Sequence, residues 1–189
     1  AAKRAVVFVG MPGAGKTFVS HKLAEKMGLA KPLISGDIVR EAVGPTKNDT
    51  ERGRRVLEVA KEFAKKKGEI GRRIAVKANK VRNDLVIIEG FRTPADLQAF
   101  RKAFPNTVVV SLEVPAKLRH ERMLKRGRAG EDNHTYLRNR DKQERGVGLD
   151  KLMKNADVKV RVRSNDPAEL DRVIDSITNQ VTPAPRKSR

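Results

Sequence analysis

The segment GMPGAGKT, residues 10–17, limits what this chain can fold into more than any other part of the sequence. It follows a short apolar run and contains three glycines, a proline and a single lysine. It matches the pattern Gly-x-x-x-x-Gly-Lys-Thr, and the residues after it have the apolar spacing of a helix. A strand, a glycine-rich turn and a helix in this order predict a phosphate-binding loop, because backbone N–H groups and the positive end of the helix dipole converge on the turn.

The same motif assigns roles to individual residues. The backbone N–H groups of residues 13–17 would surround the β-phosphate of a nucleoside triphosphate. Lys16 would bridge the β- and γ-phosphates of ATP, and Thr17 would hold Mg²⁺. The predicted ATP-binding residues of the loop are Gly13, Ala14, Gly15, Lys16 and Thr17. The alternative is a glycine-rich turn that binds no ligand.

Apolar runs of strand length alternate with helical patterns along the chain. We expect the strands at 4–10, 32–35, 84–90, 107–114 and 156–162. This order predicts an α/β fold of the P-loop NTPase type, in which helices cover both faces of a five-stranded parallel sheet to give three α/β/α layers. Valine alternates with lysine and arginine over residues 158–163, which predicts that the last strand lies at a sheet edge.

The unequal lengths of the connecting segments predict the domain organisation. We expect a single domain over residues 1–180, followed by a basic, disordered tail at 181–189. The expected core comprises residues 1–36, 84–114 and 155–180. The helical stretch at about 37–83 and the arginine-rich stretch at about 115–146 are longer than a minimal crossover requires, so we expect both to be movable.

The composition limits the cellular compartment and the binding partners that we expect for this chain. The absence of cysteine excludes disulfides and cysteine-ligated zinc. No apolar run approaches the roughly 20 residues that span a bilayer, so we expect a cytoplasmic protein with no membrane partner. The 42 lysines and arginines against 23 acidic residues give a net charge of +19, which attracts polyanions such as nucleotides and RNA. A proteome of generally basic proteins is the alternative explanation for this charge.

Two segments that follow predicted strands resemble the acceptor site of adenylate kinases. The first is GDIVRE, which is similar to their G-D-x-x-R stretch. This resemblance implies that Arg40 binds the phosphate of an acceptor nucleotide and that Asp37 lies near the transferring phosphates. The second is IEGFR, which is similar to their D-G-F-P-R stretch but has glutamate for aspartate and lacks the proline. It implies that Arg92 also clamps the acceptor phosphate and that Glu89 lies beside Mg²⁺. The alternatives are a solvated arginine on a capped helix and a strand-end charge.

A third segment is RHERMLKRGRAGEDNHTYLRNRDKQE, residues 119–144. It resembles the short, arginine-rich lid of nucleoside monophosphate kinases, including the UMP/CMP type. This resemblance implies that Arg122 and Arg140 stabilise the charge of the transition state and that Arg126 and Arg128 help to bind the nucleotide. The alternative is a pair of basic helices that binds RNA or is simply solvated.

Residues 5–180 as a whole resemble the adenylate-kinase-related P-loop kinases, and an archaeal branch of these kinases shares most of the motifs. The resemblance implies a nucleoside monophosphate kinase that moves the γ-phosphate of ATP to AMP with Mg²⁺. Residues 37–83 would be its insert for the nucleoside monophosphate (NMP), and 115–146 its lid. The catalytic residues that it implies are Lys16, Asp37, Arg92, Arg122 and Arg140.

Two other functions remain open. A dephospho-CoA kinase would use the same loop and lid, its acceptor would be a ribose hydroxyl, and Asp37 would serve as the base. An RNA- or ribosome-associated ATPase would use the basic surface, since residues 52–82 contain twelve lysines and arginines against three acidic residues. The oligomeric state is not predicted.

Overall fold

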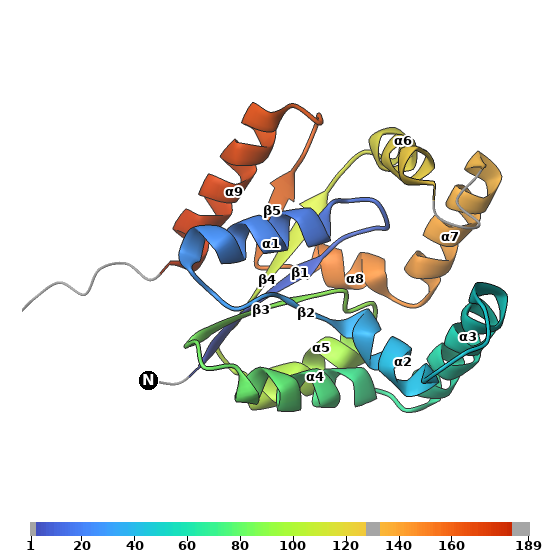
Figure 1. Ribbon diagram of the computed structural model, residues 1–189. Coiled ribbons are helices and arrows are strands. Elements are labelled where there is room, and N and C mark those ends of the chain that lie inside the picture. The colour runs from blue at the N-terminus through green and yellow to red at the C-terminus, as the bar shows by residue number, and fades with distance from the viewer. Residues whose placement is uncertain (1–2, 128–132, 183–189) are drawn as a thin grey trace, which may run out of the picture.

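Five parallel strands form one sheet in the computed structural model, which describes residues 3–127 and 133–182 (Figure 1). The strands are β1 (Arg4–Val9), β2 (Leu33–Ile34), β3 (Leu85–Glu89), β4 (Thr107–Glu113) and β5 (Val158–Arg161), in the spatial order β2-β3-β1-β4-β5. β1 lies between β3 and β4, and its Phe8 is in register with Glu89 and Val110. The phosphate loop, which begins at the end of β1, therefore lies beside the end of β3.

Helices cover both faces of the sheet. The helices of the described residues are α1 (Lys16–Met27), α2 (Ser35–Val43), α3 (Asp49–Lys65), α4 (Glu69–Lys80), α5 (Pro94–Ala103), α6 (Ala116–Arg126), α7 (His134–Gly146), α8 (Leu149–Lys154) and α9 (Pro167–Val181). α1 and α9 pack on one face, and α4, α5 and α8 pack on the other. Figure 1 shows α1 and α9 above the sheet and α4 and α5 below it. The predicted three-layer α/β/α fold with a five-stranded parallel sheet is confirmed.

The side chains of β1 divide the core into two clusters. Ala5, Val7 and Val9 face α4 and α5. Val6 and Phe8 point to the opposite face and pack against α1 and α9. All of them are buried, because a parallel strand with helices on both sides has no solvated face. Burial on both faces explains why the sequence of β1 is a continuous apolar run.

The sequence pattern does not predict α8. This helix has only six residues, so its two buried leucines, Leu149 and Leu152, are too few to establish a helical period. Gly148 precedes it with a φ of 102°, which favours glycine. α8 lies against β1, β4, α5 and α7, and it therefore joins the arginine-rich stretch to the core.

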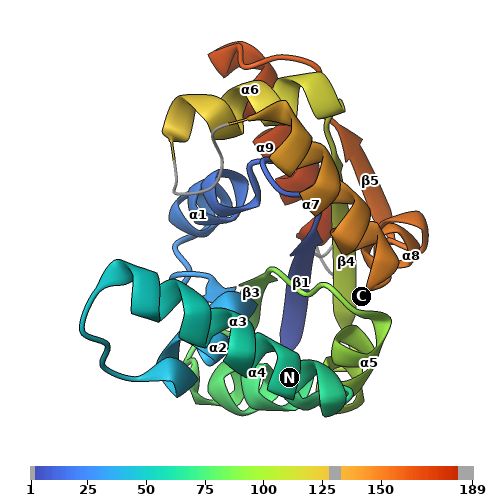
Figure 2. The same cartoon turned by 90° about the vertical axis from the view of Figure 1, so that its right-hand side faces the viewer.

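The three helices of the stretch at 37–83 differ in burial. α2 and α4 place Ile38 and Ile74 in the core, whereas α3 has no buried residue along its 17 positions. α3 packs against α2. Figure 2 shows α2 and α3 in the lower part of the view and α6 and α7 in the upper part, with the phosphate loop between the two pairs.

The last helix extends slightly further than the expected domain. α9 continues to Val181, whose side chain is buried in the core cluster, one residue past the expected boundary at 180. The expected tail from residue 183 onward lies outside the described residues. Within the part of the chain that the structure describes, no helix combines the length and the apolar character required to cross a membrane.

Candidate active site

A cleft of about 390 Å³ lies at the carboxyl ends of β1 and β3, the position at which ligands bind in open α/β sheets. The phosphate loop, the start of α2, the loop after β3, and helices α6 and α7 border it. The charged side chains that line it are Lys16, Arg40, Glu89, Arg92, Arg126, Arg140 and Glu144. Five of these are cations and two are carboxylates, so the cleft attracts a ligand with several negative charges.

The phosphate loop has the strand–turn–helix geometry that its motif predicts. Gly13 and Gly15 have φ values of 77° and 86°, in the left-handed region that other residues rarely adopt. A Cβ at position 13 would also lie 2.8 Å from the backbone carbonyl oxygen of Arg119 on α6. Glycine at position 13 therefore permits both the turn and the close approach of α6.

Lys16 begins α1 and turns back over the loop. Its ammonium donates hydrogen bonds to the backbone carbonyls of Gly10 at 2.8 Å and Met11 at 3.3 Å. Burial lowers the pKa of Lys16 to about 8, and the nearby Glu89 carboxylate offsets part of this effect. A bound phosphate would add negative charge beside the ammonium, which would raise this pKa again.

Glu89 ends β3 with both carboxylate oxygens hydrogen-bonded. Thr17 Oγ1 donates to Glu89 Oε1 at 2.8 Å, and Ser20 Oγ donates to Oε2 at 3.2 Å. Glu89 and Ser20 are buried, so these contacts fix the carboxylate at the base of the cleft. Sequence reasoning missed Ser20, although its position three residues after Thr17 places it on the same face of α1.

These oxygens fit a magnesium ion. Mg²⁺ prefers oxygen ligands, and in phosphoryl-transfer enzymes it is held by one or two protein oxygens together with phosphates and waters. Thr17 and Glu89 supply a hydroxyl and a carboxylate beside the loop. The described residues contain no group of three or more His, Asp or Glu side chains that could hold a metal alone. A metal here would therefore depend on the nucleotide for its remaining ligands.

The two arginines expected to bind the acceptor both line the cleft. Arg40 projects from α2, and its Nε donates to Asp37 Oδ1 at 2.9 Å. Arg92 follows β3 and its side chain is 61% exposed. Asp37, which the resemblance places near the transferring phosphates, is engaged by Arg40 and is not among the side chains that line the cleft.

Glu144 is a cleft residue that sequence reasoning missed. Its side chain is only 8% exposed, and its Oε1 lies 3.4 Å from Arg92 Nη1. Its other carboxylate oxygen is buried without a hydrogen-bond partner in the described structure. Arg140 precedes it by four positions, so both lie on one face of α7, and this spacing is the signal by which Glu144 is recognisable.

The arginines of α6 and α7 do not all point into the cleft. Arg126 and Arg140 line it. Arg122 instead binds the outside of the phosphate loop: its Nη1 donates to the Gly13 carbonyl at 3.3 Å and its Nε donates to Asn165 Oδ1 at 2.6 Å. Arg128, a predicted nucleotide-binding residue, lies outside the described residues.

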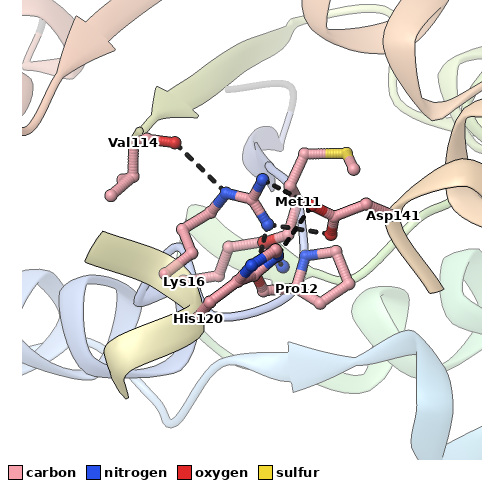
Figure 3. A network of polar contacts seen from close by, with 7 residues as sticks. Met11, Pro12, Lys16, Val114, His120 and Asp141 are labelled. Carbon is pink, nitrogen blue, oxygen red and sulfur yellow. Dashed lines mark hydrogen bonds and ion pairs between the residues drawn. The ribbon is translucent and has the colours of Figure 1, made fainter. Parts of the chain in front are cut away.

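Sequence reasoning also missed a buried polar network between α6, α7 and the phosphate loop (Figure 3). Arg119 pairs with Asp141 through two hydrogen bonds of 2.9 and 2.8 Å, and His120 Nε2 lies 3.0 Å from Asp141 Oδ2. Burial alone would raise the pKa of Asp141, but the hydrogen bonds and charge of Arg119 and His120 hold it below its usual value. Charged residues at helical spacing usually indicate solvent exposure, which conceals such a network in the sequence.

Comparisons with known proteins agree with this geometry. A family model described as "AAA domain" matches residues 9–138. The UPF0200 protein of Pyrococcus horikoshii is 33% identical over 184 residues, which cover 93% of this chain and 96% of that protein. The UPF0200 protein of Methanosarcina mazei is 31% identical over 160 residues, covering 82% and 83% of the two chains.

Among solved structures, shikimate kinase from Acinetobacter baumannii in complex with shikimate superposes with a TM-score of 0.61. It is 20% identical in sequence, and the match covers 95% of this chain and 96% of that one. This likeness supports the kinase-like P-loop fold and says nothing of the acceptor. With the family model spanning residues 9–138 and the relatives spanning nearly the whole chain, the protein belongs to the UPF0200 family and carries an AAA domain with a P-loop kinase-like fold.

Proposed function

We propose that this protein is an ATP-dependent phosphotransferase that moves the γ-phosphate of ATP to a nucleoside monophosphate, with AMP as the acceptor. The observation that carries the proposal is the distribution of cations in one cleft. Lys16 of the phosphate loop lines this cleft together with two arginines from other segments, Arg40 on α2 and Arg92 after β3. An NTPase that only hydrolyses ATP needs the lysine of the phosphate loop, but it needs no further arginines to bind the phosphate of a second substrate.

The donor half of the proposal rests on the phosphate loop. The backbone N–H groups after Gly13 and the start of α1 would hold the β-phosphate, and the Lys16 ammonium would exchange its two carbonyl partners for phosphate oxygens. Thr17 and Glu89 would hold Mg²⁺, which when bound neutralises charge on the β- and γ-phosphates.

The acceptor half rests on Arg40 and Arg92. A phosphate oxygen is already ionised at neutral pH, so transfer to AMP needs alignment and charge neutralisation rather than a protein base. The two guanidinium groups would bind the acceptor phosphate and reduce its repulsion by the γ-phosphate. Arg126 and Arg140, on the α6–α7 side of the cleft, would stabilise charge on the transferring group.

One observation favours a second candidate, transfer to a hydroxyl as in a dephospho-CoA kinase. A hydroxyl acceptor must lose its proton, and a carboxylate is a suitable base. Asp37 is held by Arg40, whereas Glu144 lines the cleft beside Arg92 with one carboxylate oxygen unpaired. Glu144 would then replace Asp37 as the base of this second reaction.

A product assay with ATP, Mg²⁺ and single acceptors separates the two candidates. AMP, CMP, UMP and dephospho-CoA are supplied in turn, and the products are resolved by anion-exchange chromatography. The proposal predicts two ADP per AMP consumed and loss of this activity in Lys16→Ala. Phosphorylation of dephospho-CoA alone would transfer the assignment to the second candidate, and full AMP phosphorylation by Lys16→Ala would contradict the proposed donor site.

A further inference from the structure

Arg119 is a buried arginine, and each of its three guanidinium nitrogens donates to an acceptor of the protein. It donates to the Val114 carbonyl at 3.1 Å, to the Pro12 carbonyl at 3.0 Å and to both carboxylate oxygens of Asp141. Only 2% of the residue is exposed. It therefore cannot bind a phosphate directly, and its role has to be sought in the three segments that it joins.

The first of these segments is the phosphate loop. Arg119 holds the Pro12 carbonyl, and Arg122, one helical turn later on α6, holds the Gly13 carbonyl. The missing side chain of Gly13 lets the backbone of α6 approach within contact distance. α6 is thus attached to the loop at successive residues. The Arg119 guanidinium thus contacts both Pro12 of the loop and Asp141 of α7, two residues that are labelled close together in Figure 3.

The second segment is α7, which carries cleft residues. Its buried face consists of Leu137, Asp141 and Glu144, a spacing of four and three residues. Asp141 directly follows Arg140 and precedes Glu144 by three residues, so its position sets the rotation of α7 about its axis. If Asp141 were released, both cleft side chains would turn with the helix.

Stability alone is a weak explanation for this pair. Removing an arginine and an aspartate from water carries a desolvation cost that often equals the Coulombic gain, and apolar replacements of similar volume are frequently as stable. A bidentate Arg–Asp pair does, however, fix distance and orientation more closely than apolar packing. The Pro12 contact extends that geometric constraint to the loop that would hold the donor phosphates.

We propose that Arg119 and Asp141 are positioning residues that hold α7 at a fixed distance and rotation from the phosphate loop, so that Arg140 and Glu144 face the cleft before substrates bind. The inference rests on the proposed kinase function. His120 supports Asp141 from the side of α6.

A double-mutant cycle on Asp141→Asn and Arg140→Ala tests this role. Asp141→Asn keeps the shape of the side chain and is expected to lower kcat about 100-fold, the loss typical of a small misplacement of catalytic groups, with a smaller change in the KM for ATP. Arg140→Ala should cost at least about 10-fold in the wild-type chain and less than about 2-fold in the Asp141→Asn background, because the two act as a unit. Equal losses in both backgrounds would overturn the proposal.

Two further variants distinguish a positioning role from a loss of activity that is caused by unfolding. Arg119→Lys keeps the charge, but one ammonium cannot reach the Pro12 carbonyl and both Asp141 oxygens, so it should reproduce the kcat loss of Asp141→Asn. Asp175→Asn, an exposed aspartate of α9 paired with Lys26, is the matched control and should leave kcat unchanged. Thermal unfolding is recorded for each. A loss of kcat that appears only when a variant is partly unfolded at the assay temperature overturns the proposal.

The affinity for a fluorescent ATP analogue separates this inference from the proposed function, since binding requires no acceptor. If the wild-type chain binds the analogue but phosphorylates no nucleoside monophosphate, the proposed function fails. The same double-mutant cycle is then measured through the dissociation constant of the ATP analogue. Non-additive effects of Asp141→Asn and Arg140→Ala on that constant support the positioning role, and additive effects refute it.

Discussion

Thr17 Oγ1 donates a 2.8 Å hydrogen bond to Glu89 Oε1, which joins the first turn of α1 to the last residue of β3. The two residues are 72 positions apart in the chain. They meet because β1 and β3 are neighbours in the sheet and both end at the cleft. A hydroxyl and a carboxylate are thereby placed together beside the phosphate loop.

Glu89→Gln is expected to raise the Mg²⁺ concentration required for half-maximal activity by about 10- to 100-fold, the usual effect of losing a side chain that supports a metal site. The Mg²⁺ concentration at half-maximal phosphotransfer, titrated at fixed ATP, measures this directly. Glu113→Gln, at the end of β4 and outside the cleft lining, should leave the midpoint unchanged. A wild-type midpoint in Glu89→Gln would remove this carboxylate from the magnesium site.

The binding of ATP should be coupled to proton uptake above neutral pH. Burial lowers the pKa of Lys16 to about 8, and the charge of a bound phosphate would raise it, so the bound state holds more protons than the free state. The affinity for ATP is therefore expected to be highest below pH 8 and to fall as the pH rises through 8. Calorimetry at pH 8 in buffers of different ionisation enthalpy should show uptake of about half a proton.

Lys16→Arg supplies the control for that measurement, because arginine stays charged over the whole range. Its binding should show no proton uptake from this position. The same buffer-dependent heat in Lys16→Arg and in the wild-type chain would assign the coupled proton to another group.

Arg92→Gln should raise the KM for AMP by about 10- to 100-fold, since a hydrogen bond between charged groups contributes about 1.5–3 kcal/mol. The KM for ATP should change little, because the proposed function assigns Arg92 to the acceptor. Arg40→Gln should act in the same way. Arg54→Gln, on the exposed face of α3 and paired with Glu58, is the control. An increase confined to the KM for ATP would contradict the assignment of the two halves.

Gly13→Ala should destabilise the fold more than Gly28→Ala does. Both glycines have positive φ, but a Cβ at position 28 meets no atom within 4 Å, whereas at position 13 it meets the Arg119 carbonyl oxygen at 2.8 Å. The expected losses in the free energy of unfolding are about 1 kcal/mol at position 28, from backbone strain alone, and about 2–4 kcal/mol at position 13. Urea unfolding of both variants measures the difference, and equal losses would exclude the clash.

Local signals explain why the fold could be predicted from the sequence. Thr93-Pro94 and Asp166-Pro167 are cap and first-turn pairs, and the structure has α5 and α9 beginning there. The apolar runs mark all five strands, and the alternation at Val158–Arg161 marks β5 as the edge strand. Each of these signals lies within about ten residues of sequence and needs no knowledge of tertiary contacts.

The site could be predicted only in part. The phosphate loop is contiguous, and the motifs identified Arg40, Glu89 and Arg92 as candidates that the structure brings to one cleft. Side-chain direction is not encoded in such motifs, so nothing in the sequence indicates that Arg122 holds the Gly13 carbonyl. The basic surface over residues 52–82 remains a prediction.

The buried charged residues are the part of the site that the sequence predicts least well. Arg119 and Asp141 are 22 positions apart on two different helices, and each is surrounded in sequence by other charged residues. A helical pattern of this kind has the composition of a solvated surface, and burial follows only from the packing of α6 and α7 over the phosphate loop. The same holds for Glu144.

α3 differs from the other long helices in burying none of its residues. Substitutions at its exposed positions consequently change the free energy of unfolding very little. Phe63 is the exception, because it is partly buried and packs against the core. α3 packs against α2, the helix that carries Arg40 of the cleft lining. If Arg40 binds the acceptor as proposed, substitutions on the face of α3 that packs against α2 would change acceptor binding without touching the buried core residues. New acceptor preferences would then arise at this helix while the phosphate loop stays unchanged.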